Sequence, residues 1–260
     1  MSQKRPLVLF TNDDGVRSPG LHAVVAAFMD VADVIVTAPE LQQSGMGRSL
    51  PLTSTGEIHE HAFEIGGQML TCYGIHGTPA QAVQVGALEI TPRRPSLVIS
   101  GVNYGENAGN GVTISGTVGA ALESAALGIP AIAISQQTEK DLHLSYSTEV
   151  DFSVAAQFAR RFGLWMMQME DLHARDIDIL KIDLPLHVTM QTEWRLTRVS
   201  RTRVYWPSRH DSSKGKPSGP LGYYQGDTSK AERDSDVYAV FEDKVVSVTP
   251  MSLDMTSRLE

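Results

Sequence analysis

The sequence contains a single cysteine, Cys72, so no disulfide can form within the chain. Such sparing use of cysteine suits a reducing compartment, and we expect a cytoplasmic protein. Long apolar runs are also absent. The only run before Asn12 is Leu7–Phe10, which is too short for the apolar core of a secretory leader. No run approaches the roughly 20 apolar residues that cross a bilayer, so we expect no membrane association.

Basic residues are outnumbered, with 22 Lys and Arg against 30 Asp and Glu, and the net charge is −8. A surface of this sign repels phosphate backbones, so we expect no nucleic-acid partner. A small anionic substrate would need a local cation or a helix N-terminus to receive it. The 260 residues, 42% of them hydrophobic, are enough to bury the core of one large α/β domain.

Several common motifs are missing as well. The chain has no Gly-Lys-Ser/Thr of a P-loop, and Gly45–Gly47 lacks the third glycine of a dinucleotide fingerprint. It also has no Gly-x-Ser-x-Gly segment, so serine-hydrolase chemistry has no support.

Apolar runs and helical patterns alternate along most of the chain. This alternation favours a mostly parallel sheet with helices on both faces. Residues 57–73 are typical of a hairpin that turns at Gly66–Gly67. The patterns predict strands at 7–10, 34–36, 97–99, 131–134, 177–184 and 244–248. They predict helices that begin at 19, at 78, at 115 or 117, and at 151.

The character of the chain changes after residue 200. Residues 207–236 are rich in Pro, Gly, Ser, Lys and Asp, and we expect an extended arm or mobile loop there, not a second core. We therefore divide the chain into a catalytic core, 1–200, and a segment 201–260 that combines the arm with a last strand and serves oligomerisation.

The most informative residues are Asn12, Asp13, Asp14 and Gly15, directly after the run Leu7–Phe10. Two adjacent carboxylates beside a buried strand are costly unless their charge is offset. A divalent cation is the simplest compensation, because hard cations prefer carboxylate oxygens. The alternative is an Asx-turn followed by a helix cap, since Asn, Asp and Gly are common turn residues.

Two further polar segments also follow predicted strands. Residues 39–49 contain Ser44 among small residues, and Arg48 could meet a phosphate or be solvated. Residues 100–116 form a predicted long, glycine-rich loop that ends at Ser115, Gly116 and Thr117, where a helix start could hold an anion. A plain loop with a capped helix remains the alternative. Because strand carboxyl ends share one sheet edge, all three polar segments should meet there.

The histidines are weaker candidates. His59 and His61 would share one face of a strand, either as a metal pair or as part of a surface hairpin. We favour the hairpin, because no third ligand is evident nearby. Cys72 is expected to be a small buried hydrophobe.

The motifs together closely resemble the SurE, or survival protein E, family across residues 6–256. Gln81 departs from the family pattern, which usually has Asp there, and this puts one interaction at a helix start in question. The resemblance is carried by segments 11–21, 38–45, 77–80, 98–107, 115–118 and 246–250, together with Asp254 and Thr256.

The resemblance implies a Rossmann-like core and a metal-dependent 5′-nucleotidase that acts on nucleoside monophosphates. It also implies association into homodimers or tetramers through an extended C-terminal arm. One Mg²⁺ or Mn²⁺ would be held by Asp13, Asp14, Ser44 and Asn103. Asn12, Asp13 and Asp14 would carry catalysis, and the phosphate would be held by Asn107, Ser115, Gly116 and Thr117.

Other functions stay open at this point. The chain could be a broad-specificity acid phosphatase or exopolyphosphatase, or a non-catalytic nucleotide-binding protein. A calcium-dependent nucleoside hydrolase would need an Asp-x-Asp-Pro-Gly-x-Asp-Asp segment, which is missing. A structural or scaffolding protein would show neither metal binding nor turnover. Tyr104 and Tyr223 are candidates for stacking on a base.

Overall fold

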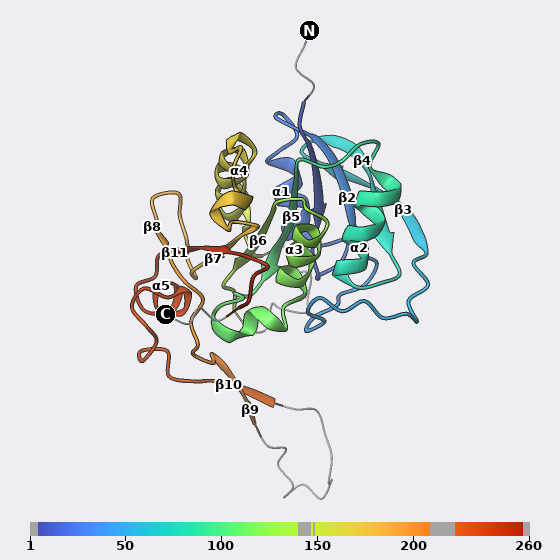
Figure 1. Cartoon of the computed structure of the whole chain (residues 1–260). Coiled ribbons are helices and arrows are strands. Elements are labelled where there is room, and N and C mark those ends of the chain that lie inside the picture. Colours follow the sequence, from blue (N-terminus) through green and yellow to red (C-terminus); the bar gives the residue numbers. More distant parts are fainter. Residues whose placement is uncertain (1–4, 140–146, 148, 209–221, 257–260) are drawn as a thin grey trace, which may run out of the picture.

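The computed structural model describes residues 5–139, 147, 149–208 and 222–256. Its centre is a nine-stranded sheet in the order β3-β4-β2-β1-β5-β6-β7-β11-β8 (Figure 1). The strands of this sheet are β1 (Leu7–Thr11), β2 (Asp33–Pro39), β3 (Ile58–Ile65), β4 (Gln68–Ile75), β5 (Leu97–Tyr104), β6 (Ala131–Gln136), β7 (Ile179–Leu184), β8 (Trp194–Leu196) and β11 (Val246–Met251).

The body of the sheet is parallel, from β4 through β2, β1, β5 and β6 to β7. The predicted hairpin is present: β3 runs antiparallel to β4 after a turn at Gly66 and Gly67, whose φ values of 57° and 77° suit glycine. At the other edge, β11 pairs antiparallel with β7 and parallel with β8. The mostly parallel α/β fold predicted from the sequence is confirmed.

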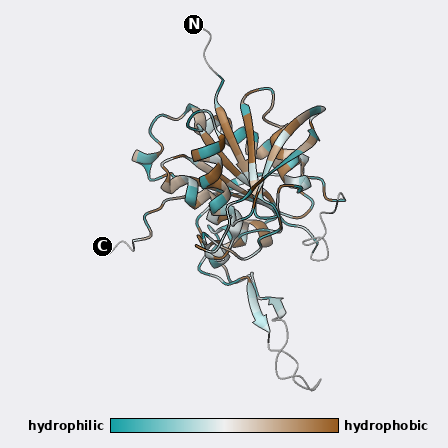
Figure 2. Cartoon of the chain, turned by 90° about the vertical axis from the view of Figure 1, so that its right-hand side faces the viewer, coloured by the Kyte–Doolittle hydropathy of each residue, from teal (hydrophilic) through white to brown (hydrophobic). Residues whose placement is uncertain are grey.

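Helices cover both faces of the sheet, as predicted. On one face, α1 (Pro19–Ala26) and α4 (Ser153–Gln168) share a core with the sheet, and on the other face α2 (Pro79–Val85) and α3 (Gly116–Ala126) do so. The central strands of the sheet are largely hydrophobic (Figure 2). No helix in the described part of the chain is both long and apolar enough to cross a membrane. Short helical turns lie at Gly86–Ile90 (η1), Gly109–Thr113 (η2) and His173–Arg175 (η4).

Strand β1 occupies the topological switch point of the sheet. It lies between β2 and β5, so the chain leaves β1 toward one side and later returns on its other side. Every residue of Leu7–Thr11 is buried, as expected for a central parallel strand with helices on both faces. Ligands of such sheets bind beyond the strand carboxyl ends at this point. The acidic turn Asn12–Gly15 therefore stands at the position where the fold favours a site.

Helix α2 begins with a complete capping box in spite of its departure from the family pattern. The Thr78 hydroxyl accepts a hydrogen bond from the Gln81 N–H at 3.2 Å, and the Gln81 side chain accepts one from the Thr78 N–H at 3.0 Å. Gln81 therefore satisfies the helix start, which the sequence had put in question.

The chain after residue 200 contains a hairpin and a short helix in addition to irregular segments. Strands β9 (Tyr205–Ser208) and β10 (Gly222–Gln225) form an antiparallel hairpin that projects from the body (Figure 1). Helix α5 (Asp236–Phe241), which the sequence did not predict, packs with Ala231 and Val204 in a small third core. Of the range 207–236, predicted as an extended arm or mobile loop, residues 226–235 are turns and irregular backbone, Asp236 is the first residue of α5, and Ala231 packs in this small core. Residues 209–221 of that range lie outside the described residues.

Two further boundaries differ from the sequence prediction. The last strand is Val246–Met251 and not 244–248, and it belongs to the central sheet. Residues 100–116 are not one long loop, because β5 continues to Tyr104 and η2 forms a helical turn at Gly109–Thr113. The division of the chain at residue 200 stays a prediction.

Candidate active site

The turn after β1 is held by the Asn12 side chain. Its Oδ1 accepts a hydrogen bond from the Gly15 N–H at 3.0 Å, and its Nδ2 donates to the Gly15 carbonyl at 3.2 Å. Gly15 has a φ of 106°, which a residue with a side chain rarely adopts. The alternative from the sequence is an Asx-turn, but the Asn12 side chain bonds to the residue three positions on and not two. Asp13 and Asp14 lie between the two bonded residues.

The two carboxylates of this turn are almost completely buried. Asp13 is 5% exposed and Asp14 is 2% exposed. Burial raises the pKa of both groups, and the neighbouring Asp13 raises the pKa of Asp14 further. Two adjacent acids that ionise only at a cost are the kind of site that a divalent cation stabilises.

Helix α3 begins directly against Asp13. The Thr117 hydroxyl donates a hydrogen bond to Asp13 Oδ1 at 2.5 Å. Hydrogen bonds from Thr117 and Gly116 lower the pKa of Asp13 and so oppose the effect of its burial. A Cβ atom on Gly116 would lie 2.7 Å from the Cβ of Asp13, so only glycine permits this approach. Ser115 is the N-cap and accepts the Val118 N–H at 3.1 Å.

The segment after β2 also contacts the acidic pair. The Gln42 side chain donates to Asp14 Oδ1 at 3.1 Å, and the Gln43 N–H donates to the Asp13 carbonyl at 2.7 Å. Ser44 follows directly and is exposed. Gln42 and Gln43, the two residues before Ser44, therefore contact the acidic pair. This agrees with the expectation that the segments after β1 and β2 meet at one edge of the sheet.

Strand β5 supplies Asn103 from the other side of the switch point. The pairing of β5 with β6 shifts register between Ser100 and Asn103, and such bulges redirect a side chain near functional sites. The Asn103 Nδ2 donates to the carbonyls of Tyr104 at 3.2 Å and Gly105 at 2.7 Å. The amide nitrogen is therefore committed to the backbone, which leaves the amide oxygen as the atom for a cation. The Tyr104 N–H donates to Asp14 Oδ2 at 3.3 Å.

Asn107 is fixed through β6 and β7. Its Nδ2 donates to Ser135 Oγ at 2.8 Å, and its backbone N–H donates to Asp183 Oδ1 at 2.8 Å. Asp183 is completely buried and forms an ion pair with Lys181. The loop that carries Asn107 is thereby attached to a charge in the core.

Lys181 joins two buried carboxylates, and the sequence did not identify this group. Its Nζ contacts Asp183 and also Asp236 Oδ2 at 3.0 Å, with all three side chains buried. Burial alone would lower the pKa of Lys181, but the two carboxylates outweigh it and the pKa is raised. Asp236 also accepts the Gly109 N–H at 3.0 Å and the Ser200 N–H at 2.9 Å. This triad therefore connects α5 and β7 to the loop of Asn107.

Arg48 has a structural contact that the sequence did not suggest. Its Nε donates to Glu123 Oε2 at 2.7 Å, and Glu123 also accepts the Gln84 side chain at 2.7 Å. Arg48 is therefore not simply solvated, and a contact with phosphate stays a prediction. It anchors the loop of Ser44 on helices α2 and α3.

The histidines form a surface hairpin cluster, as favoured from the sequence. His61 Nε2 lies 2.8 Å from Glu40 Oε2, and His59 Nε2 lies 3.2 Å from Glu57 Oε1. In the described part of the chain, no group of three His, Cys, Asp or Glu side chains is arranged to hold a metal. Cys72 is buried, and its burial raises the pKa of the thiol to about 11.

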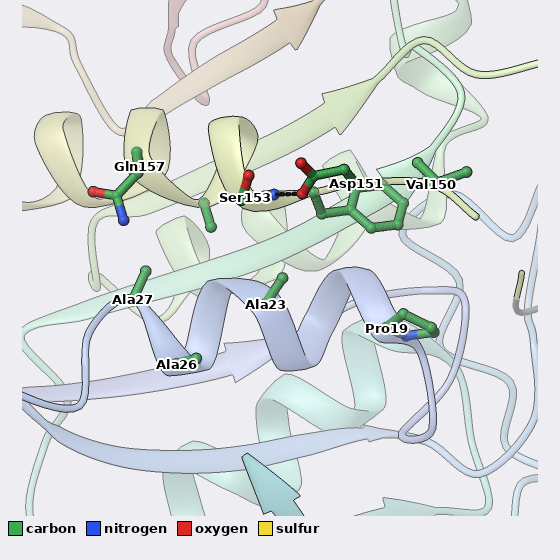
Figure 3. Close-up of a pocket in the computed structure, with 10 residues that line it drawn as sticks. Pro19, Ala23, Ala26, Ala27, Val150, Asp151, Ser153 and Gln157 are labelled. Atoms are coloured by element: carbon green, nitrogen blue, oxygen red, sulfur yellow. Dashed lines mark hydrogen bonds between the residues drawn. The ribbon is translucent and has the colours of Figure 1, made fainter. Parts of the chain in front are cut away.

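A cavity of about 500 Å³ lies between α1 and the start of α4 (Figure 3). It is lined by small and apolar residues such as Ala23 and Val150, and its carboxylate, Asp151, accepts the Ser153 N–H at 2.8 Å. No predicted site residue lines this cavity. The chemistry therefore concentrates at the sheet edge and not here.

Comparisons with known proteins find similarity over almost the whole chain. The family model described as "Survival protein SurE" matches residues 8–206. A protein named "5′-nucleotidase SurE" from Methanosarcina acetivorans is 35% identical over 98% of this chain and 95% of its own. The protein of the same name from Thermococcus kodakarensis is 34% identical over 97% and 94%. The crystal structure of the SurE protein from Aquifex aeolicus covers 97% of this chain and 95% of its own, with a TM-score of 0.72 and 28% identity.

Proposed function

The chain belongs to the survival protein SurE family, and on this premise we propose that it is a 5′-nucleotidase, which hydrolyses nucleoside 5′-monophosphates to a nucleoside and phosphate. The observation that carries the proposal is the buried pair Asp13 and Asp14 at the switch point of the sheet. The similarity of almost the whole chain to proteins named 5′-nucleotidase SurE supports the same activity.

The side chains at this edge fit a hard divalent cation. Asp13, Asp14, Ser44 and Asn103 offer only oxygen donors, which suits Mg²⁺ or Mn²⁺ better than zinc. The buried carboxylates carry a cost that one doubly charged ion would offset. When bound, such an ion supplies a Lewis acid that polarises a phosphoryl oxygen.

The protein groups around this site would act mainly by positioning. Hydrolysis of phosphate monoesters is among the slowest uncatalysed reactions, so charge and orientation dominate the barrier. The first turn of α3 holds Asp13 in place, and Asn107 is fixed by Ser135 and Asp183. We assign the phosphate contacts to Asn107 and to Ser115, Gly116 and Thr117, where the helix dipole favours an anion.

We assign the attack to water, oriented and deprotonated by Asp13 or Asp14. The water oxygen bonds to phosphorus while the bond from phosphorus to the 5′ oxygen breaks. The water proton passes to the aspartate and from it to the departing 5′ oxygen, so the nucleoside leaves with its 5′ hydroxyl and the aspartate is ionised again. A chiral thiophosphate monoester tests this assignment, because one displacement inverts the configuration at phosphorus. Retention would indicate a phospho-aspartate and contradict direct attack.

A phosphate-release panel tests the activity itself. It compares nucleoside 5′-monophosphates with simple monoesters and short polyphosphate, in EDTA, Mg²⁺ or Mn²⁺. We expect release from nucleotides with a divalent ion and none in EDTA. Equal release from every monoester would favour a broad-specificity phosphatase. Nucleotide binding without phosphate release would identify a non-catalytic sensor, and release of free base would identify a nucleoside hydrolase.

We assign the C-terminal hairpin to self-association into a dimer or tetramer. Strands β9 and β10 expose Trp206, Tyr223 and Tyr224, although an isolated hairpin of two strands is only marginally stable. Exposed aromatic side chains of this kind favour an interface. Light scattering should show an oligomer for the wild type and a smaller species for Trp206→Ser with Tyr224→Ser. We keep the expectation of a cytoplasmic location, which the single buried thiol of Cys72 supports.

A further inference from the structure

A cavity of about 370 Å³ lies between the loop that joins β2 to β3 and the segment that joins β4 to α2. This volume falls in the range typical of small-molecule sites, about 300–1,000 Å³. The cavity is separate from the hollow between α1 and α4, because no residue lines both. Its walls include Leu41, Gln43, Met46, Thr55, Ile75 and His76.

A residue that lines this cavity also contacts the acidic turn of the candidate active site. Gln43 lines it and donates its backbone N–H to the Asp13 carbonyl at 2.7 Å. The preceding residue, Gln42, donates to Asp14 Oδ1 at 3.1 Å. The loop segment Gln42–Gln43 therefore borders the acidic pair on one side and this cavity on the other.

The lining suits a neutral group with apolar faces. No lysine or arginine lines the cavity, and its carboxylate, Glu40, is engaged by His61 at 2.8 Å. Met46 is 44% exposed and Leu41 is 67% exposed, so both offer apolar surface. Side-chain hydroxyls in the lining, such as that of Thr55, add hydrogen-bonding groups. A second phosphate would find no lysine or arginine here, whereas a base and its sugar would find both apolar contacts and hydrogen-bonding groups.

The cavity is held open by bonds between its own walls. The Thr78 hydroxyl donates to the Ser49 carbonyl at 2.6 Å, and the Gln81 side chain donates to the Pro51 carbonyl at 3.0 Å. The Gly56 N–H donates to the His76 carbonyl at 3.1 Å. A preformed site of this kind avoids most of the cost of ordering a loop on binding.

We propose that this cavity binds the nucleoside part of the substrate, with Met46 and Leu41 as its apolar contacts. The assignment rests on the proposed function and narrows it to nucleotides over polyphosphate. Tyr104, a candidate for base stacking from the sequence, is not available for this role. Its ring is buried and packs edge-on against Phe152 at a centroid distance of 4.8 Å.

The test compares two substrates that differ only by the base. One is the ribonucleoside 5′-monophosphate that the wild type hydrolyses fastest, and the other is ribose 5-phosphate. We expect Met46→Ala to lower kcat/KM for the nucleotide by about tenfold or more, through KM, because lost apolar contacts in a pocket have effects of this size. Turnover of ribose 5-phosphate should be nearly unchanged.

The matched control is Leu52→Ala. Leu52 belongs to the same loop and is fully exposed, but it does not line the cavity. This variant should hydrolyse both substrates with the kcat/KM of the wild type. Equal losses on both substrates in Met46→Ala, or no loss on either, would overturn the assignment.

A binding measurement separates this assignment from the proposed function. Free adenosine, guanosine, cytidine and uridine are each titrated into the wild type and into Met46→Trp, whose larger side chain fills the cavity. Binding that the wild type shows and Met46→Trp lacks supports the cavity even if no phosphate is released, and only the proposed function then fails. If the wild type does not bind nucleosides, or if Met46→Trp still binds them, the assignment of nucleoside binding to this cavity is refuted.

Discussion

The Thr117 hydroxyl donates a 2.5 Å hydrogen bond to Asp13 Oδ1, so the first turn of α3 fixes a carboxylate at the end of β1. The two residues are far apart in sequence and meet because both lie at the carboxyl edge of one parallel sheet. The anion that this helix start holds in the structure is therefore the Asp13 side chain. In the account proposed above, the same turn orients a metal ligand and borders the phosphate.

Removing this hydroxyl should weaken metal binding. Thr117→Val keeps the shape of the side chain but cannot donate to Asp13, and groups that orient a metal ligand typically contribute about 10–100-fold to affinity. Calorimetric titration with Mn²⁺ should show a loss of about tenfold or more. Thr117→Ser, which retains the donor, should stay close to the wild type. Equal affinity in all three proteins would show that the bond has no such role.

The close approach of α3 to Asp13 should depend on glycine. A Cβ atom on Gly116 would lie 2.7 Å from Asp13 Cβ, whereas one on Gly111 would meet nothing within 4 Å. Alanine is intrinsically better than glycine in a helix, by about 1 kcal/mol, so helix propensity does not predict a loss. We expect Gly116→Ala to lose most phosphate release and Gly111→Ala to keep it. Wild-type activity in Gly116→Ala would show that Asp13 can move without consequence.

The buried triad should make Lys181 essential for stability. Lys181→Met would leave Asp183 and Asp236 buried without their cation, and breaking a buried pair in this way typically costs about 3–5 kcal/mol. Urea denaturation should show this loss in the free energy of unfolding. Arg175→Met removes an exposed pair with Asp171 and should change little. A small effect of Lys181→Met would mean that the carboxylates are readily neutralised by protons.

Glu106 should make stability depend on pH. Burial raises its pKa, the nearby Asp183 raises it further, and hydrogen bonds from Tyr205 and Gln137 oppose both effects. Because the folded-state pKa lies above the unfolded one, the favourable contribution is complete below about pH 4.3 and is lost as pH rises through the folded value. Glu106→Gln resembles the protonated form, so its Tm advantage over the wild type should widen from pH 5 to pH 8. A constant difference across this range would contradict the assignment.

The sequence was sufficient for the central part of the fold and for the place of the acidic pair. Leu7–Phe10 is apolar at every position and ends at a polar turn, which identifies a buried parallel strand and the edge where it stops. The start of α3 was also predictable, because Ser115 and the following residues form an ordinary helix cap.

Other features depended on tertiary contacts that local patterns do not encode. Lys181 alternates with apolar residues in β7, a pattern typical of a strand with one solvated face, yet the side chain is buried between two carboxylates. Helix α5 is only six residues long and follows a polar segment, so its periodicity is too short to recognise. The bond from Thr117 to Asp13 requires α3 and β1 to be placed together, which no spacing in the sequence reveals.

The most direct test of the account is the position of a bound ion. Crystals grown with Mn²⁺ give an anomalous signal that locates the metal independently of any activity. We predict one strong peak within coordination distance of Asp13 and Asp14, with Ser44 and Asn103 around it, and no peak there in Asp14→Asn. Ordered Mn²⁺ elsewhere in the molecule, or an empty acidic pair at saturating Mn²⁺, would contradict the account.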